Sequence, residues 1–177
     1  MKTLLRDITF IFIAAVVIFL LLQTTIQSFV VVGYCMEPNF DDGQRLIINK
    51  AIYHLQEPQR GDVIIFHPPI SPEDTYIKRL IALPGDTIEV KDGALYINGS
   101  KLDEPYIKEP PCYTVPRKKI PENECFVLGD NRNNANDSHN GWTVPRQNIV
   151  GKVWLSIWPP QHWGLIPHYP SGEPSAS

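Results

Sequence analysis

Three features of this sequence could take part in chemistry, and the first is a cysteine on an irregular connection. Cys35 lies in the stretch GYCMEPN, which follows a long apolar run. A thiolate is an intrinsically strong nucleophile, and a nearby base or cation raises its ionised fraction. Gly33 permits backbone angles that other residues avoid, and Pro38 excludes a regular helix or a central strand. Cys35 is therefore predicted to be an accessible nucleophile, with a buried and inert thiol as the alternative.

The second feature is a lysine within a predicted strand, residues 76–83 (YIKRLIAL). In a strand, Lys78 and Arg79 point to opposite faces, and the neighbours on both faces are apolar. Burial removes water from an ammonium group and so favours the neutral amine, which can act as a general base. Arginine essentially never loses its proton, so the chemistry selects Lys78. The alternative is that both side chains reach the strand edge and stay solvated.

The third feature is a polar loop, residues 129–139 (GDNRNNANDSH), directly after another short apolar run. It carries more side-chain hydrogen-bonding groups than a hairpin loop needs. Such a loop commonly orients neighbouring groups, and a solvated turn rich in Asp and Asn is the alternative.

An apolar segment, residues 8–26, precedes all three features. As a helix it would extend about 28 Å, close to the roughly 30 Å thickness of the hydrocarbon layer. No Ala-x-Ala-like site follows it, which disfavours a cleaved signal peptide, and no polar face interrupts it, which disfavours a buried core helix. Lys2 and Arg6 precede it, so the positive-inside rule predicts cytoplasmic residues 1–7, a single-pass anchor and an extracytoplasmic remainder.

Short β-branched and aromatic runs follow the anchor and alternate with turn residues. The predicted strands are residues 27–32, 45–49, 63–66, 76–83, 87–90, 95–98, 125–128 and 149–157. No helical periodicity separates them, and the 17 prolines oppose long helices. The pattern predicts a mainly β domain over residues 27–158, as a barrel or a sandwich, and a loosely ordered Pro-rich tail over residues 159–177.

Composition limits the partners and cofactors. With 16 basic and 19 acidic residues the formal charge is −3, so the chain lacks the basic excess that nucleic-acid binding requires. The five histidines are scattered without metal-ligand spacing, so no metal and no other cofactor is predicted. Three cysteines in an oxidising compartment permit one disulfide, for which Cys112 and Cys125 are the expected partners, leaving Cys35 free.

Four segments together resemble the type I signal peptidases, the membrane-anchored Ser/Lys proteases that remove signal peptides from exported proteins. They are residues 29–40, 60–66, 76–86 and 129–138, in the family's order. The resemblance implies a signal-peptidase-like β domain at the outer face of a bacterial plasma membrane. It implies exported preproteins as substrates, with small residues at the −1 and −3 positions of the cleavage site, and membrane lipid as the other partner.

Under this resemblance Lys78 corresponds to the family's general base and Cys35 replaces its nucleophilic serine. Ala135 stands where the family commonly has a serine that holds the lysine, and Asn39 replaces a threonine. Gly33 has no hydroxyl group, so an oxyanion hole would rely on backbone N–H groups such as that of Cys35. The matching loop residues, predicted to support the site, are Gly129, Asp130, Arg132, Asp137 and Ser138.

A thiol needs less help to ionise than an alcohol, so a Cys/Lys dyad is predicted to be active despite these departures. The alternative is a catalytically inactive, membrane-tethered homologue that keeps the peptide groove and binds signal peptides or a partner. A self-cleaving regulatory protease of related fold is a third reading, which the anchor disfavours.

Overall fold

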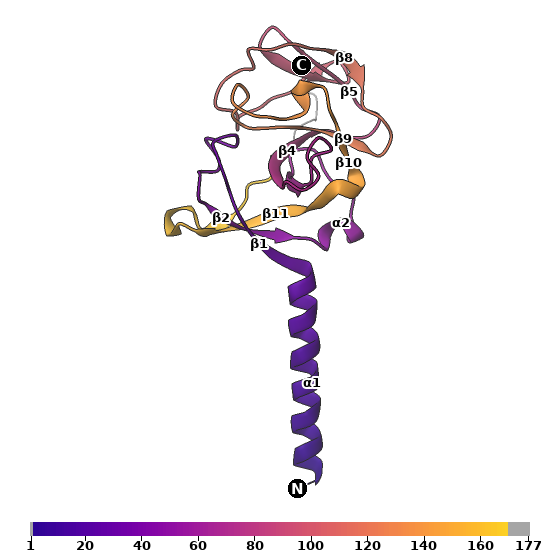
Figure 1. Ribbon diagram of the computed structural model, residues 1–177, viewed down its shortest axis with the longest axis vertical. Coiled ribbons are helices and arrows are strands. Elements are labelled where there is room, and N and C mark those ends of the chain that lie inside the picture. Colours follow the sequence, from indigo (N-terminus) through magenta and orange to yellow (C-terminus); the bar gives the residue numbers. More distant parts are fainter. Residues whose placement is uncertain (1, 170–177) are drawn as a thin grey trace.

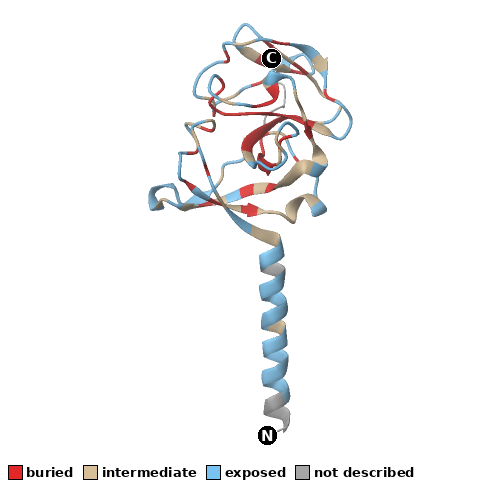
Figure 2. Cartoon of the chain, viewed as in Figure 1, coloured by how far each residue is buried: buried red, intermediate tan, exposed pale blue. Residues whose placement is uncertain are grey.

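A long helix and a β domain make up residues 2–169, the part of the chain that the computed structural model describes (Figure 1). Helix α1 (Lys2–Thr25) projects away from the domain, and its large apolar side chains from Ile8 to Leu20 are exposed (Figure 2). Within this part of the chain, only Arg6–Thr25 has the length and composition of a membrane span, with a mean hydropathy of 2.5. An apolar helix without protein neighbours is stable in lipid and not in water.

The larger of two sheets has eight antiparallel strands and curls on itself (Figure 1). Their order is β1-β2-β11-β3-β4-β9-β10, with β12 paired to β11. The strands are β1 (Ile26–Val30), β2 (Arg45–Asn49), β3 (Val63–Phe66), β4 (Tyr76–Ala82), β9 (Glu124–Leu128), β10 (Val144–Pro145), β11 (Ile149–Trp158) and β12 (Gly164–Leu165). Strand β4 is interior, paired with β3 on one side and β9 on the other.

The smaller sheet lies at the end of the domain far from α1 (Figure 1). Its order is β7-β6-β5-β8, made of β5 (Thr87–Lys91), β6 (Ala94–Ile97), β7 (Ser100–Lys101) and β8 (Val115–Lys119). Asp92 and Gly93 have φ of 52° and 69°, the left-handed conformation that a two-residue hairpin turn requires. The short helical elements are α2 (Ile52–Leu55), η1 (Ser138–Asn140), η2 (Arg146–Asn148) and η3 (Pro160–His162).

The predicted mainly β fold is confirmed, and each predicted strand is present with its ends shifted by two residues or fewer. The prediction missed β8, whose sequence VPRKK contains a proline and three basic residues, and the two-residue strands β7, β10 and β12. These strands are too short or too polar to show an apolar alternation.

Apolar packing fixes the segment that carries Cys35. Met36 and Phe40 are buried in one hydrophobic cluster with Leu46, Ile48 and Val153. Burying each such side chain contributes about 2 kcal/mol. The turn after β1 is therefore packed against the large sheet, and this packing begins at Met36, directly after Cys35.

Two expectations differ from the structure. All three cysteines are free: Cys125 is buried in β9 beside Val127 and Val144, whereas Cys112 lies on an exposed loop. The predicted Cys112–Cys125 disulfide is therefore wrong, because one thiol points into the core and the other into solvent. Residues 159–169 also differ from the expected loose tail, since they form η3 and β12 and pack on the domain. Residues 170–177 of that tail lie outside the described residues.

Candidate active site

Strand β4 and the turn after β1 bring Cys35 and Lys78 into contact across 43 residues of sequence. The Lys78 Nζ atom lies 3.0 Å from Cys35 Sγ and 2.9 Å from the carbonyl oxygen of Ile77. Lys78 is 3% exposed, and Cys35 is half-buried. A lysine amine and a thiol at this distance can exchange a proton directly.

Lys78 and Arg79 are both buried, which excludes the reading in which both side chains reach solvent. The Lys78 Nζ atom also lies 5.4 Å from the ring centroid of Tyr76. The Cys35 thiol and the Ile77 carbonyl are the hydrogen-bond partners of this buried amine.

Arg79 is held by a buried carboxylate and a carbonyl. Its Nε and Nη2 atoms donate to the two Asp130 oxygens at 2.8 and 2.6 Å, and its Nη1 atom donates to the carbonyl of Gly61 at 3.0 Å. The guanidinium carbon lies 4.3 Å from the ring centroid of Tyr106. This bidentate pair ties β4 to the polar loop that follows β9.

Two asparagines connect the polar loop to the cysteine turn. Asn39 Nδ2 donates to Asp130 Oδ2 at 2.8 Å and to the carbonyl of Tyr106 at 2.7 Å. The backbone N–H of Asn131 donates to the carbonyl of Cys35 at 3.0 Å, and its side chain donates to the carbonyl of Tyr34 at the same distance. The sequence did not predict a role for Asn39 or Asn131. Its only indication was that each residue carries an amide side chain beside a predicted site motif.

Asp137 and Ser138 stabilise the polar loop itself. Asp137 Oδ2 accepts from the backbone N–H of Gly129 at 2.9 Å, and Asp137 Oδ1 accepts from the N–H of His139 at 3.0 Å. Ser138 Oγ accepts from the N–H of Val127 at 3.1 Å. Both residues act on backbone groups of β9 and its loop, and the hydrogen bonds of the described residues give neither a contact with Cys35 or Lys78.

Gly129 and Arg132 shape the same loop. A Cβ atom on Gly129 would lie 2.5 Å from the carbonyl oxygen of Cys35 and 2.6 Å from the Ala135 Cβ atom, so only glycine fits without a shift. Arg132 Nε donates to the Gly129 carbonyl at 3.0 Å, and its guanidinium forms a buried ion pair with Glu104. The loop can therefore approach the cysteine turn as closely as backbone contact allows.

A cleft of about 420 Å³ opens at this site. Both Cys35 and Lys78 line it, together with apolar residues from the end of β1 and from β4. Its lining residues are Phe29, Val30, Val32, Cys35, Asp74, Thr75, Tyr76, Ile77, Lys78 and Asn136. The cleft gives a substrate access to the thiol.

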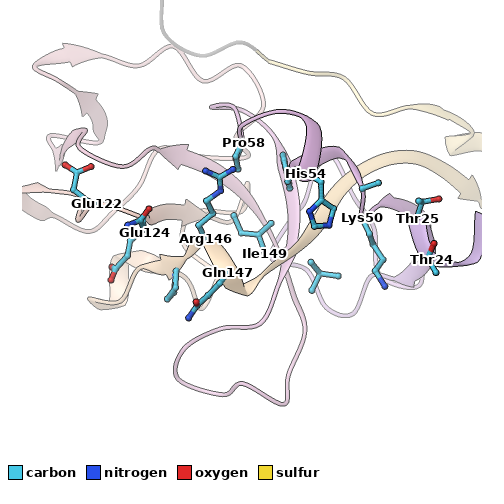
Figure 3. Close-up of a pocket in the computed structure, with 15 residues that line it drawn as sticks. Thr24, Thr25, Lys50, His54, Pro58, Glu122, Glu124, Arg146, Gln147 and Ile149 are labelled. Carbon is cyan, nitrogen blue, oxygen red and sulfur yellow. The ribbon is translucent and has the colours of Figure 1, made fainter. Parts of the chain in front are cut away.

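A larger cavity, of about 860 Å³, lies at the junction of α1 and the domain (Figure 3). Lys50 and His54 line one part of it, and Arg146, Glu122 and Glu124 line another (Figure 3). It contains neither Cys35 nor Lys78, so its size does not make it the reactive site. Within residues 2–169, no group of three or more His, Cys, Asp or Glu side chains is arranged to hold a metal ion.

Comparison with known proteins shows the family of this chain. Residues 4–158 match the family model described as signal peptidase, peptidase S26. The chain is 45% identical to a probable signal peptidase I-1 of Synechocystis over 138 residues, which are 74% of this chain and 70% of that protein. It is 33% identical to signal peptidase IB of Staphylococcus aureus over 176 residues, which are 89% and 91% of the two chains.

A chloroplast protein and a solved structure extend the comparison. Thylakoidal processing peptidase 1 of Arabidopsis thaliana is 39% identical over 71% of this chain and 40% of its own length. The crystal structure of a signal peptidase I from Enterococcus faecalis superposes with a TM-score of 0.50 and 34% identity, covering 55% of this chain and 97% of that one. This chain therefore belongs to the signal peptidase family, peptidase S26.

Proposed function

We propose that this protein is a membrane-bound endopeptidase that removes signal peptides from exported preproteins, with Cys35 and Lys78 as its catalytic dyad. The observation that carries the proposal is the 3.0 Å contact between Lys78 Nζ and Cys35 Sγ. Relatives named signal peptidase I support the reaction class. The use of cysteine in place of the family's serine is proposed from the residues of this chain and not from its relatives.

The proposed reaction begins with a neutral Lys78 accepting the thiol proton of Cys35. The sulfur then attacks the carbonyl carbon of the peptide bond, forming a C–S bond and a tetrahedral intermediate. The C–N bond breaks as Lys78 returns its proton to the leaving amine, which gives a thioester. Water, deprotonated by Lys78, hydrolyses the thioester and restores the thiol.

Backbone N–H groups are the proposed donors to the oxyanion. Within the described residues, no hydrogen bond engages the N–H of Cys35, which leaves this donor available. The N–H of Gly33 is already used, because it donates to Asp42 Oδ1 at 2.7 Å. A donor aimed at the developing negative charge stabilises the transition state more than the ground state.

The proposed substrates have small residues at the −1 and −3 positions of the cut bond. The cleft beside Cys35 is lined mainly by apolar side chains such as Phe29, Val32 and Ile77, which suits uncharged residues such as alanine. We place the domain on the outer face of the plasma membrane, with α1 as its single span. Nucleic acid, metal and cofactor have no part in the proposed reaction.

The test uses the full chain in detergent with a preprotein that carries an Ala-x-Ala site. The native protein should release the mature product. Cys35→Ala removes the nucleophile, and Lys78→Met removes the base but keeps a side chain of similar length. Each should lower kcat/KM by at least about a thousandfold, because dyad residues act as a unit.

Lys91→Met on the exposed β5–β6 hairpin is the matched control, and it should keep full activity. The three variants should have thermal unfolding curves close to that of the native protein. A native protein that binds the preprotein without cutting it would disprove the proposal, and so would a fully active Cys35→Ala variant.

A further inference from the structure

The segment after η3 crosses the domain and ends beside the network that holds the cysteine turn. Strand β12 pairs with β11, and the N–H of Ile166 donates to the carbonyl of Trp154 at 3.0 Å. Ile166 also packs against the hydrophobic cluster that contains Met36. The segment is therefore attached to the large sheet before its last described residues.

His168 forms the next attachment. Its Nδ1 atom lies 3.2 Å from Asp62 Oδ1, a fully buried carboxylate at the start of β3. The same carboxylate lies 2.6 Å from Lys152 Nζ and accepts a hydrogen bond of 2.9 Å from the Tyr53 hydroxyl. Asp62 is thus fixed from two other elements, and the contact with His168 fixes the backbone that leads to Tyr169.

Tyr169 places its ring against the buried Arg79. Its ring centroid lies 5.4 Å from the Arg79 guanidinium carbon and 5.3 Å from the Tyr106 ring centroid, with the two rings inclined at 45°. Two aromatic rings therefore contact the guanidinium of Arg79. Such contacts attract a cation and restrict the orientation of its planar group.

Hydrogen bonds and the Asp130–Asn131 peptide link connect this guanidinium to the backbone of the cysteine turn. Arg79 binds both oxygens of Asp130, and Asp130 accepts from Asn39 in the cysteine turn. The next residue, Asn131, donates its N–H to the carbonyl of Cys35. Among the described residues, Arg79 is thus one of the two side-chain partners of Asp130, and Asn39 in the cysteine turn is the other.

We propose that Tyr169 is a positioning residue for Cys35: its ring fixes Arg79, and Arg79 fixes the cysteine turn through Asp130. The catalytic meaning of this role rests on the proposed function. The structural coupling does not, because it is a property of the contacts themselves. Nothing in the described site requires Tyr169 to touch the substrate or the dyad.

The test compares Tyr169→Ala with Tyr169→Phe in the full chain. The alanine variant should show faster amide hydrogen exchange in residues 35–40 and 129–134, because the turn and the loop lose their fixed partner. The phenylalanine variant keeps a ring over the guanidinium and should exchange much more slowly in these residues than the alanine variant does. In the cleavage assay the alanine variant should lose about tenfold in kcat, the scale of a small misplacement of a reacting group, with KM little changed.

Two internal controls separate positioning from general stability. The β5–β6 hairpin lies outside the network, so its exchange should be the same in all variants. Leu165→Ala changes an exposed residue of the same segment and should leave both exchange and kcat unaltered. Uniformly faster exchange in Tyr169→Ala, or native exchange in residues 35–40 and 129–134, would overturn the inference. A chain that shows no peptidase activity would disprove the proposed function and still leave the exchange measurement decisive.

Discussion

Lys78 and Arg79 are neighbouring basic residues in one strand, and their surroundings separate their roles. Arg79 is surrounded by acceptors, including both oxygens of Asp130 and the carbonyl of Gly61. Lys78 has the carbonyl of Ile77 and the thiol of Cys35, and no carboxylate pairs with it among the described residues. Their partners therefore separate the two side chains: a carboxylate holds Arg79, which keeps its charge, and Lys78 lies against the thiol.

The sequence predicted that Lys78, and not Arg79, could act as a base. It did not predict which carboxylate pairs with Arg79. Apolar neighbours on both faces of residues 76–83 indicated burial correctly. The partner of Arg79 comes from a loop 51 residues away, and Asn39 reaches the same carboxylate across 91 residues. Such pairings depend on the order of the strands in the sheet, which a pattern of local residues does not contain.

We expect the three cysteines to differ in their reactions with iodoacetamide near neutral pH. Burial raises the pKa of the Cys125 thiol from 9.0 to about 11, and the side chain is 1% exposed. Cys125 should therefore resist alkylation in the folded protein, whereas the exposed Cys112 and the accessible Cys35 should react. Peptide mapping by mass spectrometry measures each site. Modification of Cys125 at the rate of Cys112 in the absence of urea would contradict this burial.

The raised pKa of Cys125 also predicts how the free energy of unfolding changes with pH. The folded protein keeps the Cys125 proton where the unfolded chain releases it, so this thiol's contribution to the free energy of unfolding is complete below pH 9. That contribution is lost as the pH rises through the window from 9 to about 11. Urea unfolding at both ends of the window should show a smaller decrease for Cys125→Ala than for the native protein.

At the scale of elements, the site depends on how closely the loop after β9 approaches the turn after β1. The strands on either side were predictable, because glycine and proline turns mark their ends and β-branched residues fill them. The close approach was not predictable, because Gly129 has a requirement that only its spatial neighbours create. The sequence placed Gly129 in a motif but did not show why a glycine is needed at that position.

We expect Gly129→Ala to disturb both stability and catalysis. Its Cβ atom would lie 2.5 Å from the Cys35 carbonyl oxygen, a distance that forces the turn or the loop to move. Overpacking of this kind costs about 1–3 kcal/mol. Urea unfolding should show that loss, and the rate of preprotein cleavage should decrease because the displaced group is the nucleophile's own backbone.

Gly151→Ala is a control of equal crowding in β11. Its Cβ atom would lie 2.5 Å from the carbonyl oxygen of Asn49 and 2.8 Å from Ile48, whereas a Cβ atom on Gly129 would meet the backbone of Cys35 itself. Gly151→Ala should lose a similar amount of stability with a much smaller loss of kcat per folded molecule. Equal losses of kcat in the two variants would show that Gly129 matters only for folding.

At the scale of the whole molecule, the chain order and the spatial order of the strands diverge. Strand β11, near the end of the described chain, lies between β2 and β3 and completes the large sheet. The sequence predicted enough strands for a barrel or a sandwich but not their order in the sheet. Strands that pair across a long stretch of sequence show no local pattern that identifies their partners. The segment beyond Pro159 was expected to be loose because it is rich in Pro, Gly and Ser. Its partners Asp62 and Arg79 are about 90 residues or more away in sequence, so no local pattern showed them.

We expect the β domain to face the outside of the cell and residues before α1 to face the cytoplasm. Cys112 is exposed and lies far from the proposed dyad in sequence, so it is a natural reporter. A membrane-impermeant maleimide should label Cys112 in intact bacterial cells that express the chain. In a background that carries both Cys35→Ala and Cys112→Ser, Thr3→Cys should be labelled only after the membrane is permeabilised. The reverse pattern would refute this orientation.

The direct connection between α1 and β1 has a consequence for substrate choice. The helix ends at Thr25 and the strand begins at Ile26, and the N–H of Lys50 donates to the Thr25 carbonyl at 2.8 Å. Helix α1 is thus continuous with the sheet edge that leads into the cysteine turn, without an intervening loop. In a bilayer, the thiol would stand at a set height above the lipid surface. A preprotein whose signal sequence spans the same bilayer would then be cut at the peptide bond that reaches this height. Substrate choice would therefore depend on the distance between the membrane-spanning part of the signal sequence and the cleavage site, as well as on the side chains at that site.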